Sequence, residues 1–243
     1  MNHVIIGRGQ VGNVIKENLK SKASIHDKGE WEHLHGMNKE IGVLHICIPY
    51  TDSFVSIVCN AIDVFAPVVA IIHSTVKAGT TKEISLKCIP CKLLYSPVNG
   101  RHADNFADNA KKYTKLFSGN KHAYELIKDE FFFSTLYINE NTDQLEFSKL
   151  MCTTRMYFDL VFQHELHDEC RKRGYDYHFV YDTWTRVYNQ GIREEHSNWQ
   201  RPIYDYVDGL PGGHCLRQNL LLDDNAIITY LKKYEDNHEK KSS

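Results

Sequence analysis

The chain has 243 residues, of which 42% are hydrophobic and 25% are charged, and this balance excludes a stapled miniprotein, a wholly disordered chain and a fibrous repeat. Its 29 basic side chains nearly balance its 31 acidic ones, so there is no broad basic field to bind nucleic acid or an acidic membrane surface. We therefore expect a folded protein whose partners are small molecules.

The first half of the chain alternates short apolar runs with segments of helical periodicity. The predicted strands are His3–Ile6, Ala23–His26, Val43–Ile48, Val68–Ile72 and Lys92–Tyr95, and helices are predicted after Gly12, over Ser53–Phe65 and over Gly79–Leu86. After a looser stretch at 99–108, the last elements of this region are Tyr113–Phe117, His122–Phe131 and Ser134–Ile138. The alternation predicts an α/β fold, a Rossmann-type doubly wound parallel sheet, in a dinucleotide-binding domain over residues 1–140.

Residues 141–234 predict a smaller all-helical domain with one long helix. The segment Thr142–Arg173 holds no glycine or proline, and at 1.5 Å per residue its helix would be about 48 Å long. Because so long a helix exceeds what a small domain needs for its own core, we expect it to build a homodimer. Shorter helices are predicted over Asp176–Gln190 and Leu220–Tyr234, with an aromatic-rich loop at 191–211 and a flexible charged tail at 235–243.

The glycines of the run Gly7-x-Gly9-x-x-Gly12 follow a strand and open a helix. In a dinucleotide site the first glycine permits a tight turn, the second lets backbone amides approach the pyrophosphate, and the third lets helix and sheet pack closely. The predicted phosphate site consists of Gly7, Gly9, Gln10, Val11 and Gly12. The alternative is an ordinary glycine turn.

Further residues of the predicted cofactor site end the next strands. Asp27 ends the second strand, where a carboxylate binds the ribose hydroxyls and repels a 2′-phosphate, which favours NAD over NADP. Ser74 and Thr75 follow the fourth strand and Pro49 the third, at the sheet edge where such folds bind ligands. Capping of the following helix by Ser74 or Thr80 is the alternative role of the hydroxyls.

Several runs then occur in a recognisable order. They are His73-Ser-Thr-Val-Lys-Ala-Gly-Thr-Thr81, Tyr95-Ser-Pro-Val98, Phe147-Ser-Lys-Leu150 followed by Thr153, and Gly209-Leu-Pro-Gly-Gly-His-Cys-Leu216. Over residues 1 to about 222 the chain resembles the UDP-glucose/GDP-mannose dehydrogenases. It departs from that family's pattern at His73, Val98 and Asn219, where the family has acidic residues, and it ends before the family's last nucleotide-binding domain could begin.

The resemblance implies an NAD-dependent oxidation of an alcohol through an aldehyde to an acid. Cys215 would be the nucleophile that forms a thiohemiacetal, Lys149 would stabilise the oxyanion and Thr75 would help to place a water. Thr153 and Asn219 occupy the other catalytic positions of the family. A sugar or a sugar nucleotide is among the candidate substrates.

The residues by themselves leave alternatives open. Cys215, beside Gly212, Gly213 and Arg217, is either an activated thiol or a buried structural cysteine, and Lys149 is either catalytic or an ordinary solvated lysine. A two-electron alcohol or β-hydroxyacid-type dehydrogenase is the second functional hypothesis. A noncatalytic NAD-binding remnant is the third.

We next consider whether the sequence contains a metal site, a membrane span or a secretion signal. Cys88 and Cys91 form a single CxxC pair, and His164 and His167 are three residues apart where zincins need four, so we predict no metal site. No apolar run is long enough for a membrane span, and strand sequence from His3 leaves no room for a secretion signal. The expectation is a reduced, cytoplasmic protein.

Overall fold

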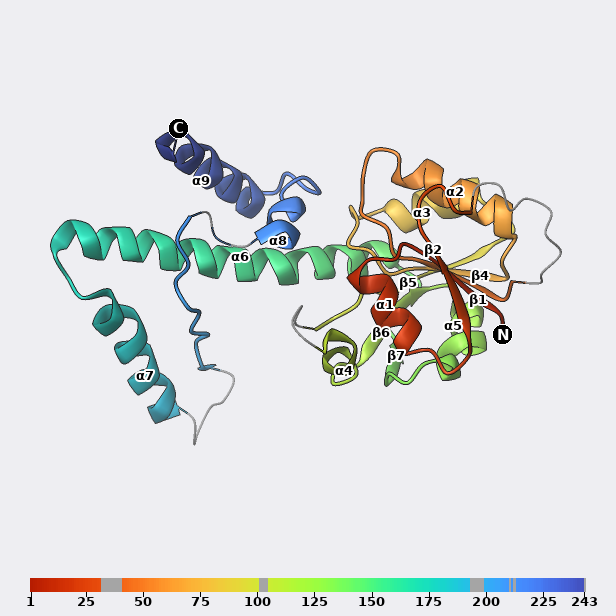
Figure 1. Cartoon of the computed structure of the whole chain (residues 1–243), viewed down its shortest axis with the longest axis horizontal. Helices are drawn as coiled ribbons and strands as arrows, with labels where there is room; N and C mark the ends of the chain where they lie inside the picture. The colour runs from red at the N-terminus through yellow and green to blue at the C-terminus, as the bar shows by residue number, and fades with distance from the viewer. Residues whose placement is uncertain (32–40, 101–104, 193–198, 210, 212, 243) are drawn as a thin grey trace. The chain divides into compact units, whose positions relative to one another are not determined.

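The computed structural model of the chain describes residues 1–31, 41–100, 105–192, 199–209, 211 and 213–242, without the side chains of 213–215 and 238–242. It forms two compact units, residues 1–150 and 151–243 (Figure 1). No helix among the described residues is long and apolar enough to cross a membrane.

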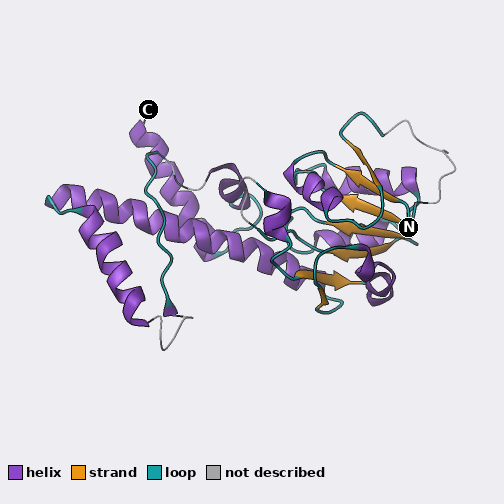
Figure 2. Ribbon diagram, turned by 60° about the horizontal axis from the view of Figure 1, so that its bottom comes forward, coloured by secondary structure: helices purple, strands orange, loops and turns teal. Residues whose placement is uncertain are grey.

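The first unit contains one seven-stranded sheet between helices (Figure 2). Its strands are β1 (His3–Ile6), β2 (Ala23–His26), β3 (Val43–Ile46), β4 (Val69–Ile72), β5 (Lys92–Tyr95), β6 (Lys115–Gly119) and β7 (Thr135–Tyr137). Its helices are α1 (Gln10–Glu17), α2 (Phe54–Phe65), α3 (Thr80–Lys87), α4 (Phe106–Ala110), α5 (Lys121–Ile127), the 3-10 turn η1 (Lys128–Glu130) and the start of α6 (Thr142–Arg173).

The strand order is β2-β1-β3-β4-β5-β6-β7, and the first five strands are parallel. β6 pairs antiparallel with β5, and β7 pairs parallel with β6, so the last two strands run against the other five. The doubly wound Rossmann-type fold is thus confirmed, with a reversed pair at one edge. Because β1 has β2 on one side and β3 on the other, the chain changes direction between them, and ligands bind at such a point beyond the carboxyl ends of the strands.

Strand periodicity divides the core between the two faces of the sheet. On one face Val4, Ile6, Leu44, Ile46, Ala70 and Ile72 pack under α2 and α3. On the other face Ile5, Val43, Val69, Ile71, Leu94 and Phe117 pack under α1 and α5. Figure 1 shows α2 and α3 together on one side of the sheet and α1 and α5 on the other. Both faces of the strands are therefore buried, as the continuous apolar runs predicted.

The second unit is helical within its described residues. It holds the rest of α6, the π-helical turn η2 (His178–Thr183), α7 (Trp184–Ile192), α8 (Gly213–Asn219) and α9 (Ala226–Ser242). Cys170, Tyr177 and Tyr181 form a small buried cluster there. α8 occupies part of the segment that the resemblance treats as a loop, and α9 continues through most of the predicted flexible tail.

Candidate functional site

The three glycines after β1 differ in their surroundings. A Cβ on Gly7, which has φ +101°, would lie 2.5 Å from the Cys47 carbonyl oxygen, and one on Gly12 would lie 1.9 Å from the Gly7 carbonyl oxygen. A Cβ on Gly9 would meet nothing within 4 Å. Gly7 and Gly12 are thus required for close packing inside the chain, whereas Gly9 leaves open space above the loop.

That open space lies at the start of α1. Gly9 is the N-cap residue and provides no side-chain hydrogen bond, and Gln10, Val11 and Gly12 form the first turn of the helix. Backbone amides at a helix N-terminus attract anions. The open space at Gly9 is thus suited to an anionic group such as a diphosphate.

The end of β2 brings acidic and basic groups beside this loop. Asp27 is exposed, and its Oδ1 accepts a hydrogen bond from the Lys28 amide at 2.9 Å. Glu30 accepts from the Asp27 amide at 2.9 Å and from the Arg8 guanidinium at 2.6 Å. Arg8 belongs to the glycine loop. Its guanidinium is paired with Glu30, beside Asp27 at the predicted ribose site.

Polar groups also link the loops after β3 and β4. The Ser74 hydroxyl donates to the Ile48 carbonyl at 2.6 Å, which ties the loop of Thr75 to the loop of Pro49. Pro49 is exposed and Thr75 is half-buried. The hydroxyl of Ser74 is therefore used inside the protein, and it does not cap a helix.

The N-terminus of α3 is capped by a side chain from α6. The Glu146 carboxylate accepts from the Gly79 amide at 2.7 Å, the Thr81 amide at 2.9 Å and the Thr81 hydroxyl at 2.5 Å. Burial raises the pKa of Glu146, and these three hydrogen bonds oppose the shift. The alternative in which Thr80 caps α3 is wrong, because its hydroxyl donates to the Lys77 carbonyl and the N-cap residue is Gly79.

Two lysines hold the turn that follows β5. Lys149 Nζ, from α6, donates to the Val98 carbonyl at 2.9 Å and lies 3.5 Å from Asn99 Oδ1. Lys115 Nζ, from the start of β6, donates to the Ser96 carbonyl at 2.9 Å and to the Pro97 carbonyl at 3.3 Å. Three successive carbonyls of this turn are thus bound by two amines, at the same sheet edge as the glycine loop.

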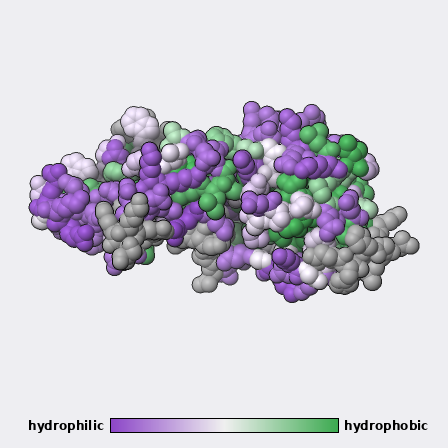
Figure 3. All heavy atoms as spheres, turned by 90° about the horizontal axis from the view of Figure 1, so that it is seen from above, coloured by the Kyte–Doolittle hydropathy of each residue, from purple (hydrophilic) through white to green (hydrophobic). Residues whose placement is uncertain are grey.

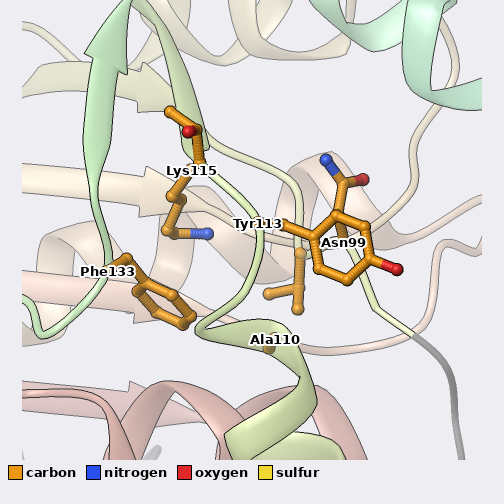
Figure 4. Close-up of a pocket in the computed structure, with 7 residues that line it drawn as sticks. Asn99, Ala110, Tyr113, Lys115 and Phe133 are labelled. Atoms are coloured by element: carbon orange, nitrogen blue, oxygen red, sulfur yellow. The ribbon is translucent and has the colours of Figure 1, made fainter.

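A small cavity adjoins this turn. It is lined by Val98, Asn99, Ala110, Tyr113, Thr114, Lys115 and Phe133. Figure 4 shows Lys115 and Phe133 on one side of it and Tyr113 and Asn99 on the other. Burial lowers the pKa of Lys115 to about 7, and the charge of Lys149 acts in the same direction. A larger groove, at the start of β5, contains none of the predicted site residues among its described lining.

The remaining predicted catalytic residues belong to the second unit. The Asn219 side-chain amide donates to the Thr153 hydroxyl, so these two predicted residues contact each other. Cys215 lies in α8, but its side chain is outside the described residues. The first unit thus brings together Gly7, Gly9, Gln10, Val11, Gly12, Asp27, Pro49, Ser74, Thr75 and Lys149 at the carboxyl edge of its sheet, and the second unit pairs Thr153 with Asn219.

Among the described residues no group of three or more histidine, cysteine or acidic side chains could hold a metal ion. His164 and His167 contact the ring of Tyr206, with centroid distances of 4.8 and 3.9 Å.

Four residues of this region were not predicted from the sequence: Arg8, Glu30, Lys115 and Glu146. A charged residue beginning the apolar run Lys115–Phe117 was the available signal for the buried lysine. Nothing local indicates the contacts of Glu146, because its partners lie 65 and 67 residues earlier in the chain.

No protein-family model and no curated protein matches this sequence. Solved structures do match. A 3-hydroxyisobutyrate dehydrogenase from Mycobacterium tuberculosis, solved with L-serine, is 14% identical, with 98% of this chain and 94% of that chain covered and a TM-score of 0.63. A UDP-glucose dehydrogenase from Pyrobaculum islandicum is 13% identical, with 97% and 68% covered and a TM-score of 0.67. Psf3 in complex with NADP+ and 2-OPP is 15% identical, with 96% and 93% covered and a TM-score of 0.59. At these identities the likeness establishes the fold.

Proposed function

We propose that the protein is an NAD-dependent dehydrogenase that oxidises a CH–OH group of a small molecule by a two-electron reaction of the hydroxyacid type. The observation that carries the proposal is the open glycine cradle at the carboxyl edge of the sheet, with Lys149 at the same edge. The similar structures include dehydrogenases by their names, and one was solved with NADP+.

In this proposal the dinucleotide supplies the acceptor for a hydride from the substrate carbon. The first turn of α1 would bind its diphosphate, and Asp27 would bind the ribose hydroxyls. The Lys149 ammonium would bind the substrate oxygen and stabilise the negative charge that develops there as the hydroxyl proton passes to solvent water. Lys115 would hold the turn under Lys149 by binding two of its carbonyls.

The two-electron reaction is favoured over the four-electron reaction by two positions of the resemblance. Val98 and Asn219 stand where the UDP-glucose/GDP-mannose dehydrogenases have acidic residues. The hydroxyacid hypothesis also needs no thiol, whereas the four-electron route depends on Cys215 as a nucleophile.

The four-electron oxidation through a Cys215 thiohemiacetal is a second candidate, which the TM-score of 0.67 to the UDP-glucose dehydrogenase favours. Cys215→Ser would abolish net conversion of aldehyde to acid in that mechanism. In the two-electron mechanism the same variant would keep its turnover. Tight binding of NAD with no turnover of any hydroxyacid or sugar nucleotide would instead indicate a noncatalytic NAD-binding protein.

Gly9→Ala tests the cofactor site without disturbing the fold. Because nothing lies within 4 Å of the added Cβ, the melting temperature should fall by no more than about 4 °C, the cost of replacing glycine by alanine at an N-cap. The methyl group would block the approach of the diphosphate, so NAD affinity measured by calorimetry should fall at least about tenfold, or about 1.4 kcal/mol. Gly191→Ala in α7, also with no atom within 4 Å, is the matched control and should bind NAD normally. Unchanged NAD binding by Gly9→Ala would contradict the cradle.

A further inference from the structure

Three buried histidines form a continuous chain across the sheet of the first unit. His3 Nδ1 lies 3.0 Å from His45 Nε2, and His45 Nδ1 lies 2.9 Å from His73 Nε2. Neighbouring rings meet edge to edge in nearly parallel planes, with interplanar angles of 21° and 12°, and the three residues are 3%, 0% and 2% exposed. The three histidines lie on β1, on β3 and directly after β4. His3 is paired with Val43 in the sheet, and His45 comes two positions after Val43. In the same way His45 is paired with Ile71, and His73 comes two positions after Ile71.

Both ends of the chain meet oxygen acceptors. His73 Nδ1 lies 2.7 Å from the Ser96 carbonyl oxygen, and His3 Nε2 lies 3.1 Å from Glu130 Oε2. A backbone carbonyl never donates a hydrogen bond, and an ionised carboxylate only accepts. The hydrogens for all contacts of the chain must therefore come from the imidazoles.

The number of hydrogens does not match the number of contacts when the rings are neutral. Three rings between two acceptors make four contacts, and each contact needs one hydrogen. A neutral imidazole carries one ring N–H, so three neutral rings supply three hydrogens. Whichever tautomers are chosen, a neutral chain leaves one contact with two facing lone pairs, which is costly in a buried place.

The charges around the chain differ between its two ends. At one end lies the Glu130 carboxylate, which also accepts from the Ser21 hydroxyl at 2.8 Å and has the Met1 amino group 3.8 Å away. Although burial opposes it, the hydrogen bonds of Ser21 and His3 lower the pKa of Glu130, so this carboxyl is ionised. At the other end Lys115 Nζ shares the Ser96 carbonyl with His73.

The groups around His45, the middle histidine of the three, are uncharged or carry a positive charge that disfavours a second one. Phe131 meets the His45 ring edge-on, and burial raises the pKa of the Cys47 thiol to about 12. Burial, and after it nearby positive charge including that of Lys115, lowers the pKa of both His45 and His73. Burial also lowers the pKa of His3, but there the Glu130 carboxylate acts in the opposite direction.

We propose that the His3–His45–His73 chain is a binding site for one proton, held by His3 against Glu130, while His45 and His73 stay neutral with their hydrogens on Nδ1. In this state His3 donates to Glu130 and His45, His45 donates to His73, and His73 donates to Ser96, so all four contacts are filled. The site is independent of the proposed dehydrogenase activity, although it shares the Ser96 carbonyl with Lys115.

The test is nitrogen NMR of the folded protein labelled with 15N at histidine and titrated from pH 8 to pH 5. We expect His45 and His73 to show a one-bond N–H coupling at Nδ1 and none at Nε2 throughout. His3 should take up one proton and show couplings at both nitrogens. An Nε2–H tautomer at His45 or His73, a second proton on the chain, or a His3 that stays singly protonated at pH 5 would overturn the proposal.

Glu130→Gln separates this proposal from simple burial of three histidines. A glutamine amide can donate to His3 Nε2, so it fills the fourth contact without a charge, and the chain should lose its proton uptake in this pH range. Glu125→Gln on α5, whose exposed carboxylate pairs with Lys128, is the matched control and should leave the His3 titration unchanged. Unaltered proton uptake in Glu130→Gln would contradict the assignment. If that variant does not fold, the tautomers of the unmodified protein still decide the question.

Discussion

At the scale of single residues, the loop after β1 separates internal packing from ligand space. Gly7 and Gly12 are enforced by carbonyl oxygens of the chain itself, and Gly9 faces open space. Arg8, between two of these glycines, is held by Glu30 rather than left to face the ribose site alone. The pair is 50% and 41% exposed, so it adds little to stability and matters through where it places the guanidinium.

This arrangement predicts how cofactor preference depends on Glu30. In the unmodified protein Asp27 and Glu30 should make NAD bind more tightly than NADP, because both carboxylates repel a 2′-phosphate. In Glu30→Gln the guanidinium of Arg8 loses its anionic partner and becomes available to the phosphate. The ratio of NADP to NAD affinity, measured by calorimetry, should rise about tenfold.

Glu17→Gln in α1 removes the same charge from an exposed position and is the control. It should leave the affinity ratio unchanged. Equal ratios in all three proteins would show that Arg8 and Glu30 have no part in the choice of cofactor.

The position of Lys149 predicts a catalytic loss without a binding loss. Lys149→Met should keep NAD affinity within about twofold, since the lysine contacts the turn after β5. Once a substrate is identified, kcat should fall by about 10²–10³, the effect of removing one donor to a developing oxyanion. Full turnover by Lys149→Met would remove Lys149 from the mechanism.

At the scale of elements, α6 supplies the cap of α3. The Glu146 side chain meets two amides and a hydroxyl at the N-terminus of α3, where no local side chain caps the helix. The hydroxyl-bearing segment at 74–81 is therefore fixed at one end by Ser74 and at the other by Glu146. This contact is internal to the first unit.

Glu146→Gln should destabilise the protein by about 2 kcal/mol, because a charge-assisted acceptor is replaced by an amide whose N–H groups face other donors. The measurement is urea unfolding at pH 7. Glu83→Gln, at an exposed ion pair with Lys87 on the same helix, should change the free energy of unfolding by less than about 0.5 kcal/mol. Equal effects of the two substitutions would contradict the capping role.

The sheet should make stability depend on pH. Burial lowers the pKa of both His45 and His73 well below 6.5, so each stays neutral in the folded state while it takes up a proton in the unfolded state below pH 6.5. Stability from these groups is therefore present above pH 6.5 and lost as the pH falls. With two protons of difference, the free energy of unfolding should decrease by up to about 2.7 kcal/mol per pH unit between pH 6 and pH 5. A free energy of unfolding in urea that does not change over this pH range would contradict the prediction that His45 and His73 stay neutral in the folded state.

At the scale of the whole molecule, the described surface retains large apolar side chains. On α6 Phe158 and Phe162, which are one helical turn apart, are 44% and 58% exposed. Green apolar areas appear among the hydrophilic ones on the face drawn in Figure 3. Surfaces of this kind on a long helix favour association with a second copy.

We predict a homodimer through α6. Light scattering at micromolar concentration should give about twice the chain mass of 28.2 kDa. Phe162→Glu, which places a charge on this surface, should shift the equilibrium toward the monomer without lowering helix content. A mass of one chain at all concentrations would remove both the dimer and this role of the helix.

Features that depend on local periodicity and local sterics could be predicted from the amino-acid sequence. The strands His3–Ile6, Ala23–His26 and Lys92–Tyr95 and the helix Thr142–Arg173 have the predicted bounds, because apolar spacing and the absence of glycine or proline act within a few residues. The requirement for glycine at positions 7 and 12 also followed from the spacing of the glycines after the first strand. The alternation of these elements was sufficient for the fold class.

Contacts between residues far apart in the chain could not be predicted in this way, because they form only in the folded protein. Thr142 and Glu146 resemble a displaced capping box, yet the carboxylate caps α3 instead. Strand pairing sets the reversed direction of β6, the neighbours of Lys115 and the alignment of the three histidines. It brings together residues that are 19 to 42 positions apart in the chain. Local periodicity assigns each side chain to one face of the sheet but does not distinguish registers that differ by two residues, so these contacts are settled only when the strands pair.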